Sequence, residues 1–159
     1  MRKIEELLHE YGLSHQNPTN KLIHWVCVPA IFFSIVGLVF SIPTGPLPEY
    51  LGLLGGFANW ATIALFLVLV YYITLSAPLA LGMFLFSAIC LAIANFLSII
   101  FPGKLWLISL GIFVISWIIQ FYGHKIEGKK PSFLKDLQFL LIGPAWLMHF
   151  IYKRLGLAY

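Results

Sequence analysis

The chain has 159 residues, of which 60% are hydrophobic and only 10% are charged. Soluble domains carry about 25% charged residues, so this composition excludes an ordinary water-soluble domain, a disordered chain and a nucleic-acid-binding module. The length is that of one domain, 1–159. The net charge of +4 would suit an anionic partner, but the distribution of the charges along the chain points to a lipid bilayer.

The first residues, Met1–Tyr11, predict a short amphipathic helix rather than a cleaved signal peptide, because they are rich in charge and lack an apolar core. We expect this helix to end at Gly12 and to lie on the membrane surface or against a helix bundle. Its apolar side chains have the i, i+3, i+4, i+7 spacing of one helix face: Ile4, Leu7, Leu8 and Tyr11.

Four long apolar stretches follow, separated by breaks rich in Pro and Gly at 43–48, 76–78 and 102–104. A membrane-spanning helix needs about 20 apolar residues, and lipid offers no partner to an unpaired backbone amide. We therefore predict an all-α integral membrane protein, a single membrane-embedded domain built on a bundle of about four transmembrane helices. The predicted spans are Leu22–Ile42, Leu51–Leu75, Pro78–Phe101 and Leu105–Tyr122.

The last apolar stretch, Leu137–Tyr152, is short and contains Gly143-Pro144, so we interpret it as a re-entrant or interfacial segment. All of the ten Lys and Arg residues except Lys104 lie before the first span or after the fourth. An even number of crossings places both termini on one side, and the positive-inside rule makes that side cytoplasmic.

The five histidines avoid the middle of the four spans. His15 and His24 flank the start of the first span, and His124 follows the fourth, so the predicted topology brings these three to the same membrane face. His9 lies on the polar side of the first helix, where we expect it to be solvated. His149, beside Trp146, is either an interfacial side chain or a further ligand.

The polar residues near His24 and near His124 each leave two interpretations open. Asn20 precedes His24 by one helical turn, which suits either a structural pair or a ligand with its hydrogen-bond partner. His124 lies between Gln120 and Glu127, which suits either a solvated loop or a metal ligand that Glu127 orients or assists as a base. Imidazole and oxygen ligands suit zinc, iron or another first-row metal.

A straight helix would hold His15 and His24 about 13–14 Å apart, too far for one mononuclear centre. Asn17-Pro18 resolves this difficulty, because Asn is a favoured N-cap and Pro a favoured first helical residue. We therefore expect the helix to begin near Pro18 and the segment with His15 to fold back towards His24.

Two stretches resemble the yeast Mpo family: Tyr11–Trp25 (YGLSHQNPTNKLIHW), followed by Pro29, and Gln120–Glu127 (QFYGHKIE), followed by Pro131. The order of motifs and apolar segments is similar over nearly the whole chain. Characterised members of that family are membrane-embedded, iron(II)-dependent dioxygenases of 2-hydroxy fatty acids. They carry out α-oxidation, which shortens the acid by one carbon.

The resemblance implies an oxidoreductase with Fe(2+) as cofactor and with a 2-hydroxy fatty acid and O2 as substrates. Its metal ligands would be His15, His24 and His124, with His149 as a candidate fourth. Glu127 and Asn20 would serve as catalytic residues, and Lys21 and Gln120 would bind the substrate. The expected location is the endoplasmic reticulum in a eukaryote or the inner membrane in a bacterium.

Two other functions suit the same residues. A zinc-dependent membrane lipid hydrolase would use similar histidines but would work without oxygen. A non-catalytic transporter or scaffold would use them structurally, although transporters more often place polar groups at mid-bilayer. The sequence leaves substrate chain length, stereochemistry and oligomeric state open.

Overall fold

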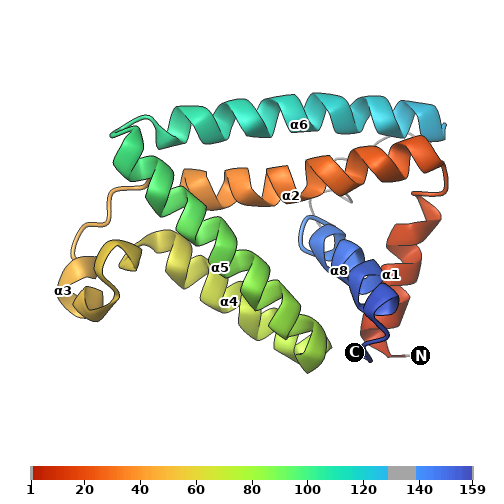
Figure 1. Ribbon diagram of the computed structural model, residues 1–159, viewed down its shortest axis with the longest axis horizontal. Helices are drawn as coiled ribbons and strands as arrows, with labels where there is room; N and C mark the ends of the chain where they lie inside the picture. The colour runs from red at the N-terminus through yellow and green to blue at the C-terminus, as the bar shows by residue number, and fades with distance from the viewer. Residues whose placement is uncertain (1, 129–138, 159) are drawn as a thin grey trace.

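The computed structural model describes residues 2–128 and 139–158, and all regular secondary structure in these two ranges is helical. The predicted all-α fold is confirmed (Figure 1). The elements are α1 (Lys3–Leu13), α2 (Pro18–Phe40), α3 (Leu47–Leu51), the 3-10 helix η1 (Gly52–Phe57), α4 (Trp60–Leu75), α5 (Ala77–Ile100), α6 (Leu105–Glu127) and α8 (Ile142–Leu155).

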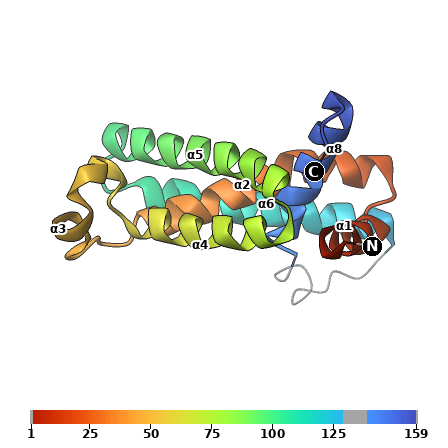
Figure 2. The same cartoon turned by 90° about the horizontal axis from the view of Figure 1, so that it is seen from below.

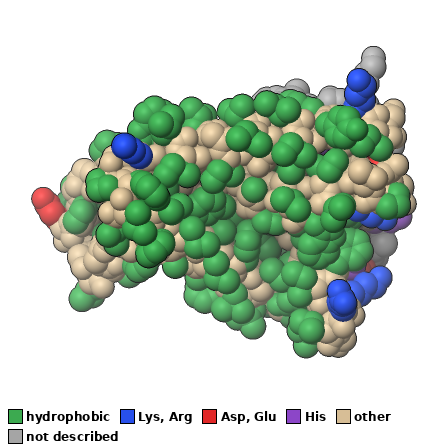
Figure 3. All heavy atoms as spheres, turned by 45° about the horizontal axis from the view of Figure 1, so that its top comes forward, with side chains coloured by type: hydrophobic (Ala, Val, Ile, Leu, Met, Phe, Trp, Pro, Cys, Tyr) green, Lys and Arg blue, Asp and Glu red, His purple; other side chains and the backbone are tan. Residues whose placement is uncertain are grey.

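Three helices, α2, α5 and α6, are long and apolar enough to cross a membrane, with mean hydropathies of 2.3, 2.4 and 2.0. The bent segment from α3 through α4 makes a fourth candidate. Many large apolar side chains on these helices are exposed, among them Phe66, Phe96 and Ile118 at 60–63%. Figure 3 shows this surface as a broad hydrophobic area with charged side chains at its edges. The chain is thus an all-α membrane protein.

The second predicted span, Leu51–Leu75, is not one straight helix. The chain bends by 81° between Leu47–Phe57 and α4. Gly55 adopts a positive φ of 54°, and the side chain of Asn59 accepts a hydrogen bond from the backbone N–H of Thr62 at 3.2 Å, which starts a new helix. The 16 residues of α4 extend about 24 Å, less than the hydrocarbon thickness of about 30 Å.

The longest helix contact joins α2 to α6, which run antiparallel along the length of the molecule (Figures 1 and 2). Gly37 allows this close approach, because a Cβ at that position would overlap the Oγ of Ser109. As a result the first turns of α2 and the last turns of α6 lie side by side at one end of the bundle.

The terminal helices α1 and α8 cover that same end (Figure 1). They share a buried apolar cluster with α4 and α5 that includes Ile4, Leu79, Met83 and Ile142. Contrary to our expectation, α1 does not end at Gly12 but continues to Leu13. Gly12 lies inside the helix and faces Trp146. A Cβ added at Gly12 would lie 3.4 Å from the indole nitrogen of Trp146.

Two tyrosine hydroxyls attach α8 to the bundle. Tyr72 donates to the carbonyl of Leu141 at 2.5 Å, and Tyr152 donates to that of Pro78 at 2.6 Å. The 14 residues of α8 extend about 21 Å, so this helix is too short to cross a bilayer alone. The Gly143-Pro144 pair lies in its first turn and does not interrupt it. Residues 137 and 138 of the predicted segment lie outside the described residues.

The contact between Gly37 and Ser109 predicts a position-specific loss of stability. Gly37→Ala should lower the free energy of unfolding by about 1–3 kcal/mol, because the added methyl group forces α2 away from α6. Thermal unfolding in detergent micelles measures the effect. The matched control is Gly111→Ala, since a Cβ at Gly111 meets nothing within 4 Å. Equal melting temperatures for the two variants would contradict the assigned packing.

Candidate metal centre

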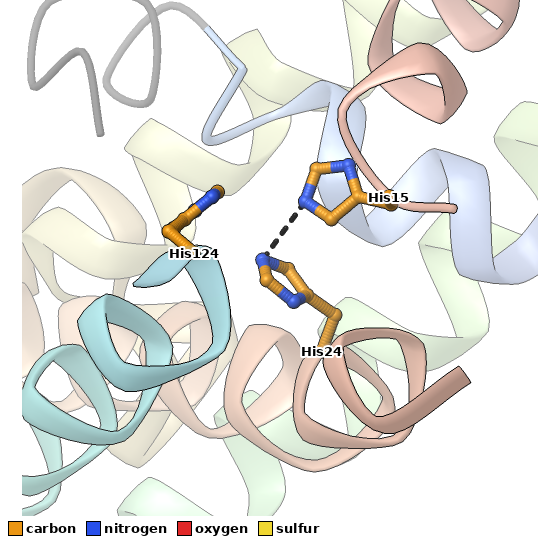
Figure 4. Close-up of side chains that lie close together, drawn as sticks. All are labelled: His15, His24 and His124. Atoms are coloured by element: carbon orange, nitrogen blue, oxygen red, sulfur yellow. Dashed lines mark hydrogen bonds between the residues drawn. The ribbon is translucent and has the colours of Figure 1, made fainter. Parts of the chain in front are cut away.

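The three histidines that the topology was expected to bring together do meet (Figure 4). His15 lies in the link between α1 and α2, His24 in the second turn of α2, and His124 in the last turn of α6. Their side chains are buried, with exposed fractions of 3%, 1% and 5%. One ring nitrogen from each lies within 4.8 Å of the others, so the group could hold a metal ion.

The protonation of two of these rings is fixed by their backbone partners. Nδ1 of His15 lies 2.7 Å from the carbonyl oxygen of Tyr11, and Nδ1 of His24 lies 2.9 Å from that of Asn20. A carbonyl only accepts hydrogen bonds, so each Nδ1 carries the proton of the neutral ring. Both Nε2 atoms then present lone pairs, as in metal-ligating histidines whose other nitrogen donates to a carbonyl.

Those two Nε2 atoms lie 3.0 Å apart (dashed line in Figure 4). Two lone pairs at this distance repel each other unless a proton or a cation lies between them. Two imidazole nitrogens bound to one ion at about 2.0–2.1 Å lie roughly 2.8–3.4 Å apart for ligand angles between a right angle and the tetrahedral angle. The observed spacing therefore fits a shared metal ion.

The chain turns back between His15 and His24 at Asn17-Pro18, as the sequence predicted. Asn17 is the N-cap of α2, and its side chain accepts from the backbone N–H of Thr19 at 2.9 Å and of Asn20 at 3.4 Å. Pro18 is the first helical residue. This cap separates α1 from α2 and allows His15 to approach His24 from outside the helix.

Glu127 fixes this turn to the end of α6. Its carboxylate accepts from the backbone N–H of Gln16 at 2.8 Å and of Asn17 at 2.9 Å. The side-chain amide of Asn20 donates to the same carboxylate at 3.1 Å. Hydrogen bonds to a charged acceptor are about twice as strong as neutral ones, so this carboxylate holds the link with His15 against the helix that carries His124.

Asn20 is fully buried and contributes to the centre in two ways. Its backbone carbonyl accepts from His24, and its side-chain amide donates to Glu127. Its Oδ1 has no donor among the described residues and packs against Gly123 of α6, where a Cβ would overlap it. Gly123 therefore allows α2 and α6 to approach each other beside the histidines.

Tyr11 also belongs to this site, although the sequence motifs did not mark it as a site residue. Its ring stacks on that of His15, with centroids 4.3 Å apart and planes at 16°. Its carbonyl accepts from the same imidazole. The signal was the spacing, because Tyr11 precedes His15 by four residues as Asn20 precedes His24, which places a carbonyl one helical turn before each ring.

A small cavity of about 30 Å³ adjoins the centre, with room for about two water-sized molecules. His24, His124 and Gln120 supply its polar lining. The other walls are mostly apolar and come from α2, α6 and the segment before α8: Val28, Ile31, Trp117, Phe139 and Leu140, with Tyr11 and Gly143. Gln120 is thus placed where a small bound molecule would meet both the histidines and an apolar surface.

Two sequence-predicted site residues lie elsewhere. Lys21 lines a separate groove between α2 and α8. His149 lines a hollow with the exposed His9 and does not belong to the histidine group, which among the described residues has three members. Burial, together with the positive charge of Lys153, lowers the pKa of His149 below its usual value.

The contact between Gly123 and Asn20 predicts a specific effect on metal binding. Gly123→Ala should weaken the binding of a divalent probe such as Co²⁺ by about 10–100-fold, the usual cost of disturbing a ligand's hydrogen-bond partners. Absorption titration of the purified protein measures the affinity. Gly111→Ala, on the open side of the same helix, should bind Co²⁺ as the unchanged protein does. Unaltered affinity in Gly123→Ala would contradict a centre at this position.

Similarity to known proteins extends over nearly the whole chain. The model of a family described as 2-hydroxy-palmitic acid dioxygenase Mpo1-like matches residues 1–155. The chain is 29% identical over 150 residues to the 2-hydroxy-palmitic acid dioxygenase MPO1 of Saccharomyces cerevisiae, and the match covers 90% of this chain and 76% of the yeast protein. No solved structure is significantly similar to it. Because the family model covers nearly the whole chain, including all three histidines of the centre, the protein belongs to the Mpo1-like family.

Proposed function

We propose that this protein is an iron(II)-dependent dioxygenase that shortens 2-hydroxy fatty acids by one carbon. The observation that carries the proposal is the buried group of three imidazoles, in which two unprotonated nitrogens face each other at 3.0 Å. The family and the yeast relative, whose name is 2-hydroxy-palmitic acid dioxygenase, support the substrate class and the use of oxygen.

His15, His24 and His124 would hold the iron as neutral nitrogen ligands. Three protein ligands leave coordination positions open, where bound iron(II) would supply a meeting point for oxygen and for the carboxylate and hydroxyl of the substrate. Glu127 and Asn20 do not need to touch the substrate to be essential. Their contacts support a positioning role, since Glu127 holds the His15 turn and Asn20 orients His24.

Gln120 is suited to meet the head group of the substrate, because it lines the cavity beside His24 and His124. The apolar walls of this cavity come in part from α2 and α6, whose outer faces expose large apolar side chains. An acyl tail that stays among apolar side chains avoids a cost of about 0.8 kcal/mol for each methylene exposed to water. The reacting head would then lie near the membrane surface while the tail stays in apolar surroundings.

The charges support an orientation with both termini in the cytoplasm. Arg2, Lys3 and Lys125 lie at the end of the molecule that holds the histidines, whereas Lys104 lies at the opposite end, where α5 meets α6. Positive charge concentrates on the cytoplasmic side of membrane proteins. We accordingly place the metal centre at the cytoplasmic face, of the endoplasmic reticulum in a eukaryote or of the inner membrane in a bacterium.

The function is tested with protein purified without oxygen and loaded with iron(II). It should consume 2-hydroxypalmitate when oxygen is admitted and should not consume it under nitrogen. Consumption without oxygen would also contradict a dioxygenase, and it would not favour the zinc-type hydrolase, because this free acid has no ester or amide bond to hydrolyse. No consumption in air by iron-loaded protein would contradict the dioxygenase assignment.

Single alanine substitutions test the ligand set. His15→Ala, His24→Ala and His124→Ala should each lower activity at least about 100-fold and reduce bound iron, because losing a ligand costs more than losing its hydrogen-bond partner. Iron content and 2-hydroxypalmitate turnover are measured on protein that remains in the membrane fraction. His9→Ala is the control, and a loss there equal to the other three would mean that the ligand set is wrong.

A further inference from the structure

A groove of about 710 Å³ lies between α2 and α8, at the end of the molecule that holds the three histidines. Lys21 and Trp25 of α2 form one side, and Phe150, Lys153, Arg154 and Leu155 of α8 form the other. Within the described part of the chain, the groove shares no lining residue with the cavity beside the histidines. It is therefore a separate site, and its role does not depend on the reaction proposed above.

Among the described residues, the groove is lined by three cations and no carboxylate. In the described part of the chain the only salt bridge joins Arg2 to Glu5, so no acidic side chain there neutralises Lys21, Lys153 or Arg154. Lys153 and Arg154 lie in the last turn of α8, where the helix dipole favours positive charge. Lys21 lies near the N-terminal end of α2, where the same effect disfavours it. A bound anion would offset this concentration of positive charge.

The apolar part of the groove continues along the outside of α2. Trp25 is 40% exposed, and its ring lies 6.3 Å from that of Phe150. Leu22 and Val26, on either side of Trp25 in the sequence, are each 66% exposed. Since α2 is a candidate membrane span that begins at Pro18, the cations lie near its end and the exposed apolar side chains lead towards its middle. Aromatic side chains concentrate at this depth of a membrane.

We propose that this groove binds one anionic phospholipid of the surrounding bilayer. The phosphate would lie among Lys21, Lys153 and Arg154, and an acyl chain would lie along Leu22 and Val26. Basic pockets between membrane helices on the cytoplasmic side are typical sites for anionic head groups. The lipid would connect the first turns of α2 to the end of α8, a helix whose Trp146 lies 5.5 Å, ring to ring, from His15.

Native mass spectrometry of the full chain in a neutral detergent tests this proposal. The probes are phosphatidylglycerol, phosphatidylcholine, inorganic phosphate and palmitate. The double variant Lys21→Gln/Arg154→Gln should bind phosphatidylglycerol about thirtyfold more weakly than the unchanged protein, because each cation near the membrane surface contributes about one kcal/mol to binding. The matched control Lys3→Gln/Lys104→Gln loses the same charge outside the groove and should bind this lipid within about twofold of the unchanged protein.

The unchanged protein should also prefer phosphatidylglycerol over phosphatidylcholine, and neither phosphate nor palmitate should displace the bound lipid at equal concentration. Equal binding of the two lipids, or equal weakening in both double variants, would overturn the proposal. Displacement by palmitate or phosphate would show that the groove recognises a free anion rather than a phospholipid. Circular dichroism confirms that each variant keeps its helices.

Discussion

A neutral imidazole carries a single N–H. In two of the three central histidines, this N–H already donates to a backbone carbonyl. The carbonyls of Tyr11 and Asn20 accept from His15 and His24, so the remaining nitrogens face each other as lone pairs at 3.0 Å. Both rings are buried. A metal ion shared by the two rings, with His124 as a third ligand within reach, would relieve this repulsion.

The rest of the structure holds these rings in place. Close packing of α2 on α6, permitted by Gly37 and Gly123, sets the distance between His24 and His124. The carboxylate of Glu127 then ties the link that carries His15 to the end of α6. Helices α1 and α8 cover the centre and pack together on α4 and α5, so the terminal segments of the chain complete the site rather than extend from it.

The convergence of the histidines could be predicted because it follows from topology: an even number of spans returns the chain to the same face. The turn at Asn17-Pro18 could be predicted from local N-cap chemistry. The role of Gly123 could not, because the approach of α6 to α2 depends on Asn20, which is distant in the sequence. Tyr11 was missed although its four-residue spacing to His15 carried the signal. The bend before α4 was not predicted either. The residues around Gly55 are apolar like the rest of the stretch, and only the N-cap residue Asn59 indicates that a new helix begins.

X-ray absorption spectroscopy of the iron(II)-loaded protein tests the central claim most directly. We expect scattering from three imidazole rings bound to one iron at about 2.0–2.1 Å, the distance usual for metal–imidazole bonds. We also expect His24→Ala to remove one of the three rings. A spectrum without imidazole scattering, or one that His24→Ala leaves unchanged, would contradict a metal centre built by these histidines.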